Sequence, residues 1–395
     1  MNESYWHRAQ RSIAQGALTN SKHPDSLING LFPTHVKKGY GCYLTDEKGQ
    51  KWLDFMGGLG TGLFGTGNPR ITMEAIRAIN DGSCHSLPTV YEVETAEKLK
   101  QMFHWVDRWK FLKTGSEACS ASIRIARNAT GRYKVLSEAY HGWHDEFCSL
   151  TPPAHGVPDH PFIGKLTDLS QIKNDVAAVI VEPVVTDIST NRREWLKELR
   201  QKCSDNGVML IFDEVITGFR FPKFSVSAYW NIEPDLIILG KAIGGGFPLA
   251  AVGGRPWVMD DRKYFVSSTY AGETASLAAC QAVINLLLKD PSYNIENLWD
   301  EGQKFMDEFN SLGPIQLEGY PTRGIITGDH GLFMQEAAKA KMLFCKSWFY
   351  NWDLAKEKYG FMPQIKEIQE RIGEGLAKME YPAPSSPFSM KVREK

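Results

Sequence analysis

The sequence has no excess of charge of either sign and no long apolar run. Its 395 residues hold 45 basic and 46 acidic side chains, which gives a net charge of −1. A balanced chain offers no electrostatic reason to expect nucleic acid or an anionic membrane as its main partner. No uncharged apolar stretch is long enough to span a bilayer, and from the polar first eight residues we expect no signal peptide. We therefore expect a protein that acts without a membrane or a nucleic-acid partner.

Paired cysteines are also missing. The seven cysteines are odd in number and scattered, and none lies in a C-x-x-C pair. A disulfide framework or a zinc site would need closer and more regular spacing. The pattern predicts reduced thiols in a cytoplasmic protein.

The composition is that of an ordinary globular protein, with 43% apolar and 23% charged residues. A chain of 395 residues is long enough to bury a large core and to form two domains. Between about residues 70 and 250, helical and strand patterns alternate, which predicts an α/β fold with a mostly parallel sheet. Strands are expected at 110–113, 134–136, 176–181, 208–215 and 236–239, and helices at 71–80, 95–103, 117–130, 194–203, 275–288, 298–312 and 365–378. We expect an N-terminal arm at 1–50 that forms part of a small domain, a large domain at 51–285 and a small α+β C-terminal domain at 286–395.

Two of the expected strands end in chemically useful side chains. The continuously apolar run at 208–215 carries Asp213 near its end, and the run at 236–239 is followed by Lys241 and a glycine-rich loop. Desolvation lowers the pKa of a lysine and makes its amine a nucleophile toward aldehydes. If Lys241 stood alone, the simplest interpretation would be a solvated lysine at the end of a strand. An acid at the neighbouring strand end changes that interpretation, because it can keep a pyridine nitrogen protonated. Together they predict a site for pyridoxal 5'-phosphate.

A second motif predicts where a phosphate would bind. Thr114, Gly115 and Ser116 stand between a short strand and a helix, and the first N–H groups of a helix attract anions. Simple capping of that helix by Thr114 or Ser116 is the alternative.

The segment after the next strand holds Tyr140 and His141, either of which could stack on a flat cofactor ring. A metal site from His141, His144 and Asp145 is a rival interpretation. Glu182 ends another strand, and we expect it either to face the same cleft or, alternatively, to cap a helix or be exposed to solvent. The proline-rich residues 151–165 have no periodicity, which suggests either an active-site lid or a plain surface loop.

The order of these motifs resembles that of the class III aminotransferases, and within them the glutamate-1-semialdehyde aminomutase-like branch. The matching stretches are Thr-Gly-Ser-Glu-Ala (114–118), Tyr-His-Gly (140–142), Val-Glu-Pro-Val (181–184), Phe-Asp-Glu-Val-Ile-Thr-Gly-Phe-Arg (212–220) and the lysine block (234–248). The resemblance covers about residues 39–279 and extends weakly to about 355. It implies a fold-type-I enzyme that moves an amino group by a ping-pong Schiff-base mechanism, from a small-molecule amino donor to an aldehyde or ketone acceptor such as a sugar or a keto acid.

The resemblance also implies roles for individual residues. Lys241 would hold the cofactor aldehyde and shuttle a proton, and Asp213 would pair with the pyridine nitrogen. Val215 and Tyr140 would flank the ring, and His141 would lie beside it. Gly115 and Ser116 would hold the phosphate. Thr269 would reach the phosphate in the partner subunit, which implies a homodimer with shared active sites.

Some residues depart from the aminomutase pattern. Lys38 stands where an arginine would grip a substrate carboxylate, and a lysine is the poorer bidentate partner. The stretch 57–60 lacks the tryptophan of the aminomutases, and Glu273 replaces the asparagine that often follows the threonine loop. These departures favour an aminotransferase over a glutamate-1-semialdehyde aminomutase, which remains the alternative. A pyridoxal-phosphate-binding scaffold without catalysis is the alternative of another class.

Overall fold

The computed structural model describes residues 3–28, 30–138, 140–148, 157, 159–261 and 263–378. Its central feature is a seven-stranded sheet in the order β4-β10-β9-β8-β7-β5-β6. The strands are Arg108–Leu112 (β4), Ala250–Gly254 (β10), Leu236–Leu239 (β9), Met209–Glu214 (β8), Val176–Val181 (β7), Lys134–Ser137 (β5) and Ile163–Lys165 (β6). From β9 to β6 all neighbours are parallel, whereas β10 is antiparallel to both β9 and β4. The predicted mostly parallel sheet is confirmed.

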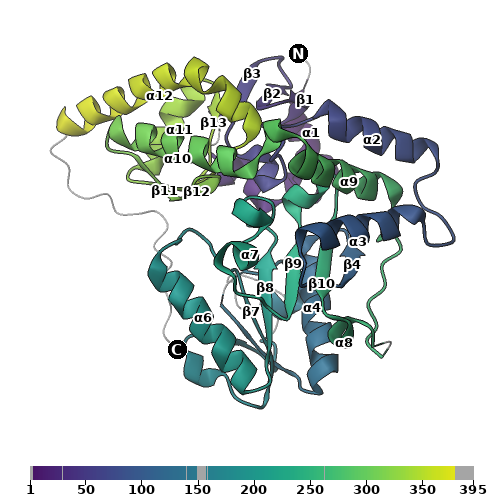
Figure 1. Ribbon diagram of the computed structural model, residues 1–395. Helices are drawn as coiled ribbons and strands as arrows, with labels where there is room; N and C mark the ends of the chain where they lie inside the picture. The colour runs from purple at the N-terminus through teal and green to yellow at the C-terminus, as the bar shows by residue number, and fades with distance from the viewer. Residues whose placement is uncertain are drawn as a thin grey trace.

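Helices cover both faces of this sheet (Figure 1). Helix α4 (Gly115–Thr130) shares a core with Ile211 on one face, and α6 (Thr190–Asp205) shares a core with Leu210 on the other. Residues 210 and 211 are neighbours on β8, and side chains alternate across a strand. Strands buried on both faces need continuous apolar runs, which is the pattern in β7 and β8.

The remaining helices build the rest of the molecule. They are Tyr5–Ser12 (α1), Pro69–Asn80 (α2), Val90–Met102 (α3), Asp145–Cys148 (α5), Val226–Trp230 (α7), Pro256–Met259 (α8), Thr274–Lys289 (α9), Ile295–Ser311 (α10), His330–Lys339 (α11) and Trp352–Lys378 (α12). Helix α9 is buried along most of its length and packs against α2 and α3. Among the described helices, none has an apolar stretch of the length needed to cross a bilayer.

Both ends of the chain contribute to one small sheet. A hairpin joins Tyr43–Asp46 (β2) to Lys51–Asp54 (β3), next to Val36–Tyr40 (β1). Met342–Leu343 (β13) then pairs in parallel with β3. A further antiparallel sheet holds Gln316–Tyr320 (β11), Arg323–Thr327 (β12) and Ser347–Phe349 (β14). Figure 1 draws these elements with α10, α11 and α12 above the large sheet. The domain boundaries at residues 50 and 285 stay predictions.

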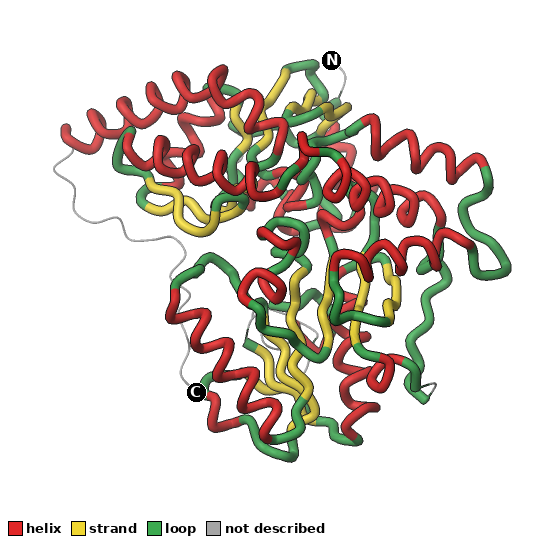
Figure 2. Tube along the Cα trace, viewed as in Figure 1, coloured by secondary structure: helices red, strands yellow, loops and turns green. Residues whose placement is uncertain are grey.

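The structure differs from the sequence-based expectation in several places, and Figure 2 shows its helices in red and its strands in yellow. Strand β10 and helix α11 were not predicted. The segment 151–165 was expected to be a loop, but its last three residues form β6, whose backbone pairs with β5. Residues 151–156 and 158 lie outside the described residues, so the lid stays a prediction.

Candidate active site

A cavity of about 300 Å³ opens where the parallel strands of the large sheet end. This is the edge at which open α/β sheets bind their ligands. The sequence-predicted residues that line it are Gly115, Ser116, Tyr140, His141, Glu182, Asp213, Val215 and Lys241. Thr61, Lys113, Cys119 and Leu249 also line it, although no sequence signal singled them out. The structure therefore brings most of the predicted site into one place.

Lys241 lies two residues beyond the end of β9, and its backbone has a φ of 44°, in the left-handed region. Such strain in a non-glycine residue is typical of functional sites. Burial lowers the pKa of Lys241, and the nearby charges of Asp213 and Glu182 only partly oppose that shift. The side chain therefore favours the neutral amine more than an exposed lysine does.

Asp213, on β8, is held by three donors. Its Oδ2 accepts a hydrogen bond from His141 Nδ1 at 2.7 Å and a weaker one from Cys119 Sγ at 3.5 Å, and its Oδ1 accepts from the Val215 N–H at 3.0 Å. Burial alone would raise the pKa of Asp213, but the hydrogen bond and charge of His141, with smaller help from Val215 and Lys241, bring the pKa below its usual value. Asp213 is thus a buried carboxylate that stays ionised.

The two other acids at these strand ends differ from Asp213. Glu182 follows β7 and lines the cavity, and its Oε2 is buried without a hydrogen-bond partner. Burial and the nearby charge of Asp213 raise the pKa of Glu182 to about 7. Glu214 takes no part in the cavity lining. Its carboxylate accepts the N–H groups of Val226 and Ser227 at 2.7 and 2.9 Å and caps α7.

The N-terminus of α4 faces the cavity and has the features of an anion site. Thr114 and Glu117 form a capping box, which confirms that Thr114 caps the helix. The N–H groups of Gly115 and Ser116 lie in the first turn, where no helix carbonyl can accept them. Capping and anion binding are therefore compatible at this helix end. The Thr114 side chain accepts the N–H group of Glu117, and the N–H groups of Gly115 and Ser116 stay available for an anion.

Glycines keep the space around this helix end open. A methyl group on Gly115 would lie 3.0 Å from the Val215 methyls, and one on Gly240 would meet the same side chain at 3.0 Å. A methyl on Gly142 would lie 2.4 Å from Ser116 Oγ. A larger residue at Gly115 or Gly240 would fill the cradle between the helix and Val215.

The rival metal site is not formed by the residues predicted for it. His144 Nδ1 pairs with Ser120 Oγ at 2.8 Å, away from His141, which pairs with Asp213. Within the described ranges, the one set of three possible ligands is Cys119, His141 and Asp213. Burial, and then the charge of Asp213, raise the pKa of the Cys119 thiol well above its usual value, so the sulfur keeps its proton and acts as a donor rather than as a ligand.

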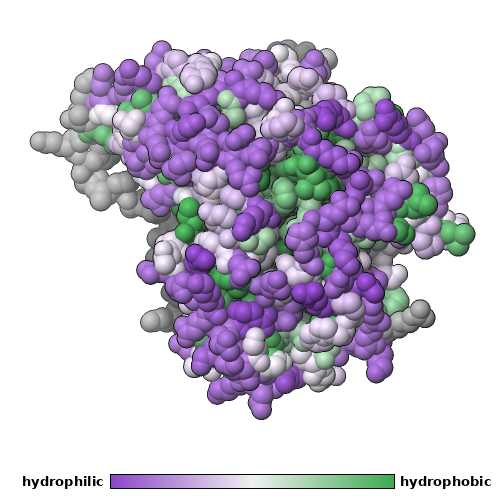
Figure 3. Space-filling view, in the orientation of Figure 1, coloured by the Kyte–Doolittle hydropathy of each residue, from purple (hydrophilic) through white to green (hydrophobic). Residues whose placement is uncertain are grey.

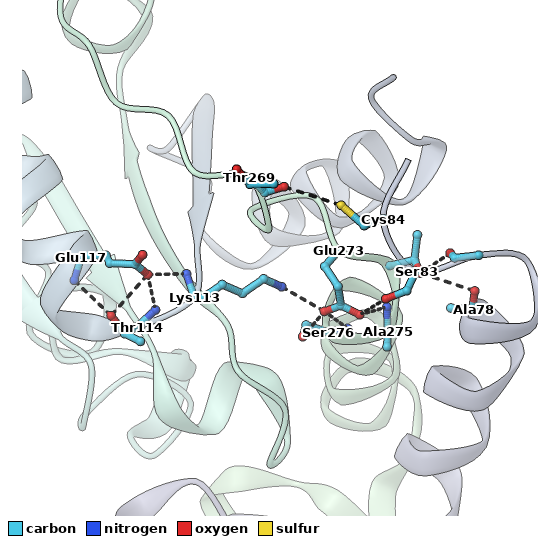
Figure 4. A network of polar contacts seen from close by, with 12 residues as sticks. Ala78, Ser83, Cys84, Lys113, Thr114, Glu117, Thr269, Glu273, Ala275 and Ser276 are labelled. Atoms are coloured by element: carbon cyan, nitrogen blue, oxygen red, sulfur yellow. Dashed lines mark hydrogen bonds and ion pairs between the residues drawn. The ribbon is translucent and has the colours of Figure 1, made fainter. Parts of the chain in front are cut away.

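A polar network anchors the segment that carries Thr269 (Figure 4). Lys113 leaves the end of β4 and forms an ion pair with Glu273 Oε2 at 3.0 Å, and both side chains are largely buried. Glu273 in turn accepts the first N–H groups of α9. The Thr269 carbonyl accepts a hydrogen bond from Cys84 Sγ at 3.7 Å. Glu273, the departure noted in the sequence, is therefore a helix cap and an ion-pair partner.

Two predicted residues lie outside the cavity of this chain. Thr269 is exposed, and Lys38 is exposed on β1. Neither lines the cavity. Their roles stay predictions.

Comparison with known proteins agrees with this geometry. The model of the family described as "Aminotransferase class-III" matches residues 29–165 and 159–328. A glutamate-1-semialdehyde 2,1-aminomutase of Symbiobacterium thermophilum is 34% identical over 301 residues, which covers 69% of each chain. The FumI protein of Sphingopyxis sp. MTA144 superimposes with a TM-score of 0.86 at 22% identity, covering 95% of this chain and 97% of that chain. The glutamate-1-semialdehyde aminomutase of Pseudomonas aeruginosa PAO1 superimposes with a TM-score of 0.77 at 21% identity, covering 92% of this chain and 93% of the other.

The fold and the site define a fold-type-I enzyme that depends on pyridoxal 5'-phosphate. The chain belongs to the class III aminotransferase family, as the sequence motifs predicted. Its residues fit the cofactor: a helix N-terminus for the phosphate, an ionised carboxylate for the pyridine nitrogen and a buried lysine amine for the aldehyde meet in one cavity.

Proposed function

We propose that this enzyme transfers an amino group between a small-molecule amino donor and a carbonyl acceptor. The observation that carries the proposal is the position of Lys241, whose buried amine shares a cavity with the ionised Asp213. When bound, pyridoxal phosphate supplies an aldehyde and an electron-withdrawing ring. The described residues supply the rest of the chemistry.

Each of these residues has a distinct task in the proposed reaction. Lys241, with its pKa lowered by burial, accepts a proton from the substrate carbon and returns one as a general acid and base. Asp213 keeps its negative charge opposite the pyridine nitrogen, because His141 donates to it. The N–H groups of Gly115 and Ser116 bind the phosphate. Glu182 lies in the same cavity and is proposed to contact the substrate.

Two reactions can use these residues. One is transfer between two molecules, a donor and an acceptor. The other moves the amino group within one molecule, and the names of the curated relatives favour it. The turn at Gly57–Gly60 (η4), which lacks the aminomutase tryptophan, favours transfer between two molecules.

A half-reaction assay separates these possibilities. The holoenzyme is mixed with single amino donors, and the cofactor absorbance is followed. With a donor alone, an aminotransferase converts the cofactor to its amine form. Addition of a carbonyl acceptor then restores the aldehyde form of the cofactor. An aminomutase consumes glutamate-1-semialdehyde without any added donor. A protein that binds the cofactor but responds to neither is a scaffold, and the proposed function would then be wrong.

The proposed assembly is a homodimer with shared active sites. Exposed apolar side chains gather on α2, among them Met73, Ile76 and Ile79, and on α3, where Val90 and Val93 are exposed. Figure 3 shows apolar surface at the right-hand edge of its view, where Figure 1 draws the connection between α2 and α3. Such a surface suits a subunit interface. The exposed position of Thr269 is consistent with a residue that serves the site of a second copy.

A further inference from the structure

One arginine outside the cavity joins the two segments that carry His141 and Glu182. Arg192 lies in the first turn of α6, and its side chain is 15% exposed. Its Nη1 and Nη2 donate to the two carboxylate oxygens of Glu138, each at 2.7 Å. Nη2 also donates to the Glu182 carbonyl at 2.8 Å, and Nε donates to the Pro183 carbonyl at 2.9 Å. All three nitrogens of the guanidinium group are therefore engaged.

The partners of Arg192 follow two neighbouring strands of the large sheet. Glu138 comes directly after β5, just before Tyr140 and His141, which both line the cavity. Glu182 comes directly after β7, which pairs in parallel with β5, and it lines the cavity too. A single side chain on α6 thus connects two segments that form the wall of the active site.

Arg192 is itself fixed on its helix. Its N–H group donates at 3.3 Å to the Oγ of Ser189, which caps α6, and its Cζ lies 4.4 Å from the centre of the Trp195 ring. A planar guanidinium donates two parallel hydrogen bonds to a carboxylate, whereas a lysine ammonium acts as a point charge. A lysine at this position would keep the charge but could not make the same four hydrogen bonds.

A second ion pair on the same helix shows what is particular to the first. Arg200 donates to Asp235 Oδ2 at 2.8 Å, and both side chains are 22% exposed, so this pair is buried to a similar degree. Asp235 directly precedes β9, whereas the cavity lies at the other ends of the strands. Helix α6 is therefore attached at both edges of the sheet, and of the two attachments it is that of Arg192 that contacts the cavity wall.

His141 is the group through which this attachment reaches the chemistry. Its Nδ1 donates to Asp213 Oδ2 at 2.7 Å. A hydrogen bond weakens steeply as its geometry worsens, so a displaced imidazole would hold the carboxylate less firmly. The other ionisable groups near Asp213 are Tyr140, on the same segment as His141, and, from other elements, Cys119 on α4, Glu182 after β7 and Lys241 after β9.

We propose that Arg192 is a positioning residue of the active site, which holds the segment with His141 and the segment with Glu182 at a fixed separation. Glu138 is its partner in this role. The inference rests on the proposed amino transfer and adds to it a residue that acts without touching substrate or cofactor. Because Arg192 acts through the geometry of its hydrogen bonds, a lysine with the same charge should not replace it.

The test compares Arg192→Lys and Glu138→Gln with the matched control Arg200→Lys, all loaded with cofactor and assayed with the donor that reacts best with the wild type. Arg192→Lys should lower the rate of the first half-reaction about 10- to 100-fold, because small displacements of reacting groups have effects of this size. The acid limb of that rate should move to higher pH, since His141 then stabilises the ionised Asp213 less. Glu138→Gln, which keeps the carbonyl contacts, should show a smaller effect in the same direction.

The visible circular dichroism of the bound cofactor gives a readout that does not depend on turnover, because it reports the asymmetry of the groups around the ring. We expect its intensity to change in Arg192→Lys and to keep the wild-type value in Arg200→Lys. The melting temperatures of both variants are measured beside it. Arg200→Lys should lose about as much stability as Arg192→Lys and leave the rate, the acid limb and the dichroism unchanged.

Two outcomes would overturn the inference. One is a rate, an acid limb and a dichroism in Arg192→Lys that match those of the wild type, and the amino transfer would then stand. The other is an equal change in Arg192→Lys and Arg200→Lys, which would leave Arg192 a purely structural role. If Arg192→Lys does not fold, Glu138→Gln decides by the same readouts. If the wild type reacts with no donor, the proposed amino transfer fails, and the dichroism alone decides the role of Arg192.

Discussion

Replacing His141 by glutamine tests how the protein keeps Asp213 ionised. Glutamine has no nitrogen bonded to its Cγ atom, so the 2.7 Å hydrogen bond from His141 Nδ1 is lost, and Asp213 Oδ2 then keeps only the thiol of Cys119 at 3.5 Å. A hydrogen bond to a charged group contributes about 1.5–3 kcal/mol, which corresponds to about one to two pKa units. The pKa of Asp213, which is now below its usual value, should rise by that amount in His141→Gln.

The sign of the pH effect follows from that shift. Because the pKa of Asp213 is lowered in the folded protein, the ionised form is present above this pKa and is lost as the pH falls through it. A higher pKa in His141→Gln moves this loss to higher pH. The acid limb of the half-reaction rate should therefore shift upward by about one to two pH units.

Two variants calibrate this experiment. Asp213→Asn should abolish the acid limb and most of the activity, because the amide cannot carry the charge. Cys119→Ala removes the longer and weaker hydrogen bond and should shift the limb by less than His141→Gln does. If the acid limb of His141→Gln stays where the wild type has it while the protein remains folded and binds cofactor, our account of Asp213 is refuted.

Three further predictions concern Glu182, the Lys113 network and the assembly. The pKa of Glu182 is raised from the ordinary glutamate value of 4.5 to about 7, so ionisation of Glu182 destabilises the fold as the pH rises through this range. Glu182→Gln should therefore stabilise the cofactor-free protein at pH 8 by about 1–3 kcal/mol in chemical denaturation. Equal stability of the two proteins at both pH 5 and pH 8 would contradict this. A double-mutant cycle on Lys113→Met and Glu273→Gln should give a coupling free energy of about 1–3 kcal/mol in the unfolding of the cofactor-free protein, because the ion pair is largely buried. If the effects of the two single mutations simply add, the ion pair does not stabilise the fold. Lys241→Ala and Thr269→Arg should each be inactive alone but should partly restore activity when their subunits exchange, because one site of the mixed dimer is then wild type; continued inactivity after demonstrated exchange would reject shared sites.

The strand ends could be predicted because their sequences are distinctive. Continuous apolar runs followed by Asp213 and Lys241 identify buried parallel strands and place both side chains at one edge of the sheet. Strand β10 was missed because Ala250–Gly254 is rich in alanine and glycine, which have low β-propensity. Its place is set by pairing with β4 and β9, and that is a tertiary effect.

The donors to Asp213 and the contacts of Arg220 could not be predicted by any local rule. Cys119 is one helical turn past the Thr114 cap and gives no sign in the sequence that it reaches Asp213, 94 positions away. Arg220 lies at the end of a recognised motif, but its task depends on the carbonyls of Gly60, Thr322 and Tyr350, which come from both ends of the chain.

The site places two carboxylates at the ends of neighbouring strands and gives them different protonation. Asp213 has three donors and stays ionised, whereas Glu182 Oε2 has none and its pKa rises to about 7. The two pKa values are linked, because the charge on Asp213 is itself a cause of the raised pKa of Glu182. A pyridine nitrogen needs a fixed negative charge, whereas a substrate amine or carbonyl is served by a group that can gain or lose a proton near neutral pH. Burial with hydrogen-bond donors and burial without them thus give one cavity both kinds of acid.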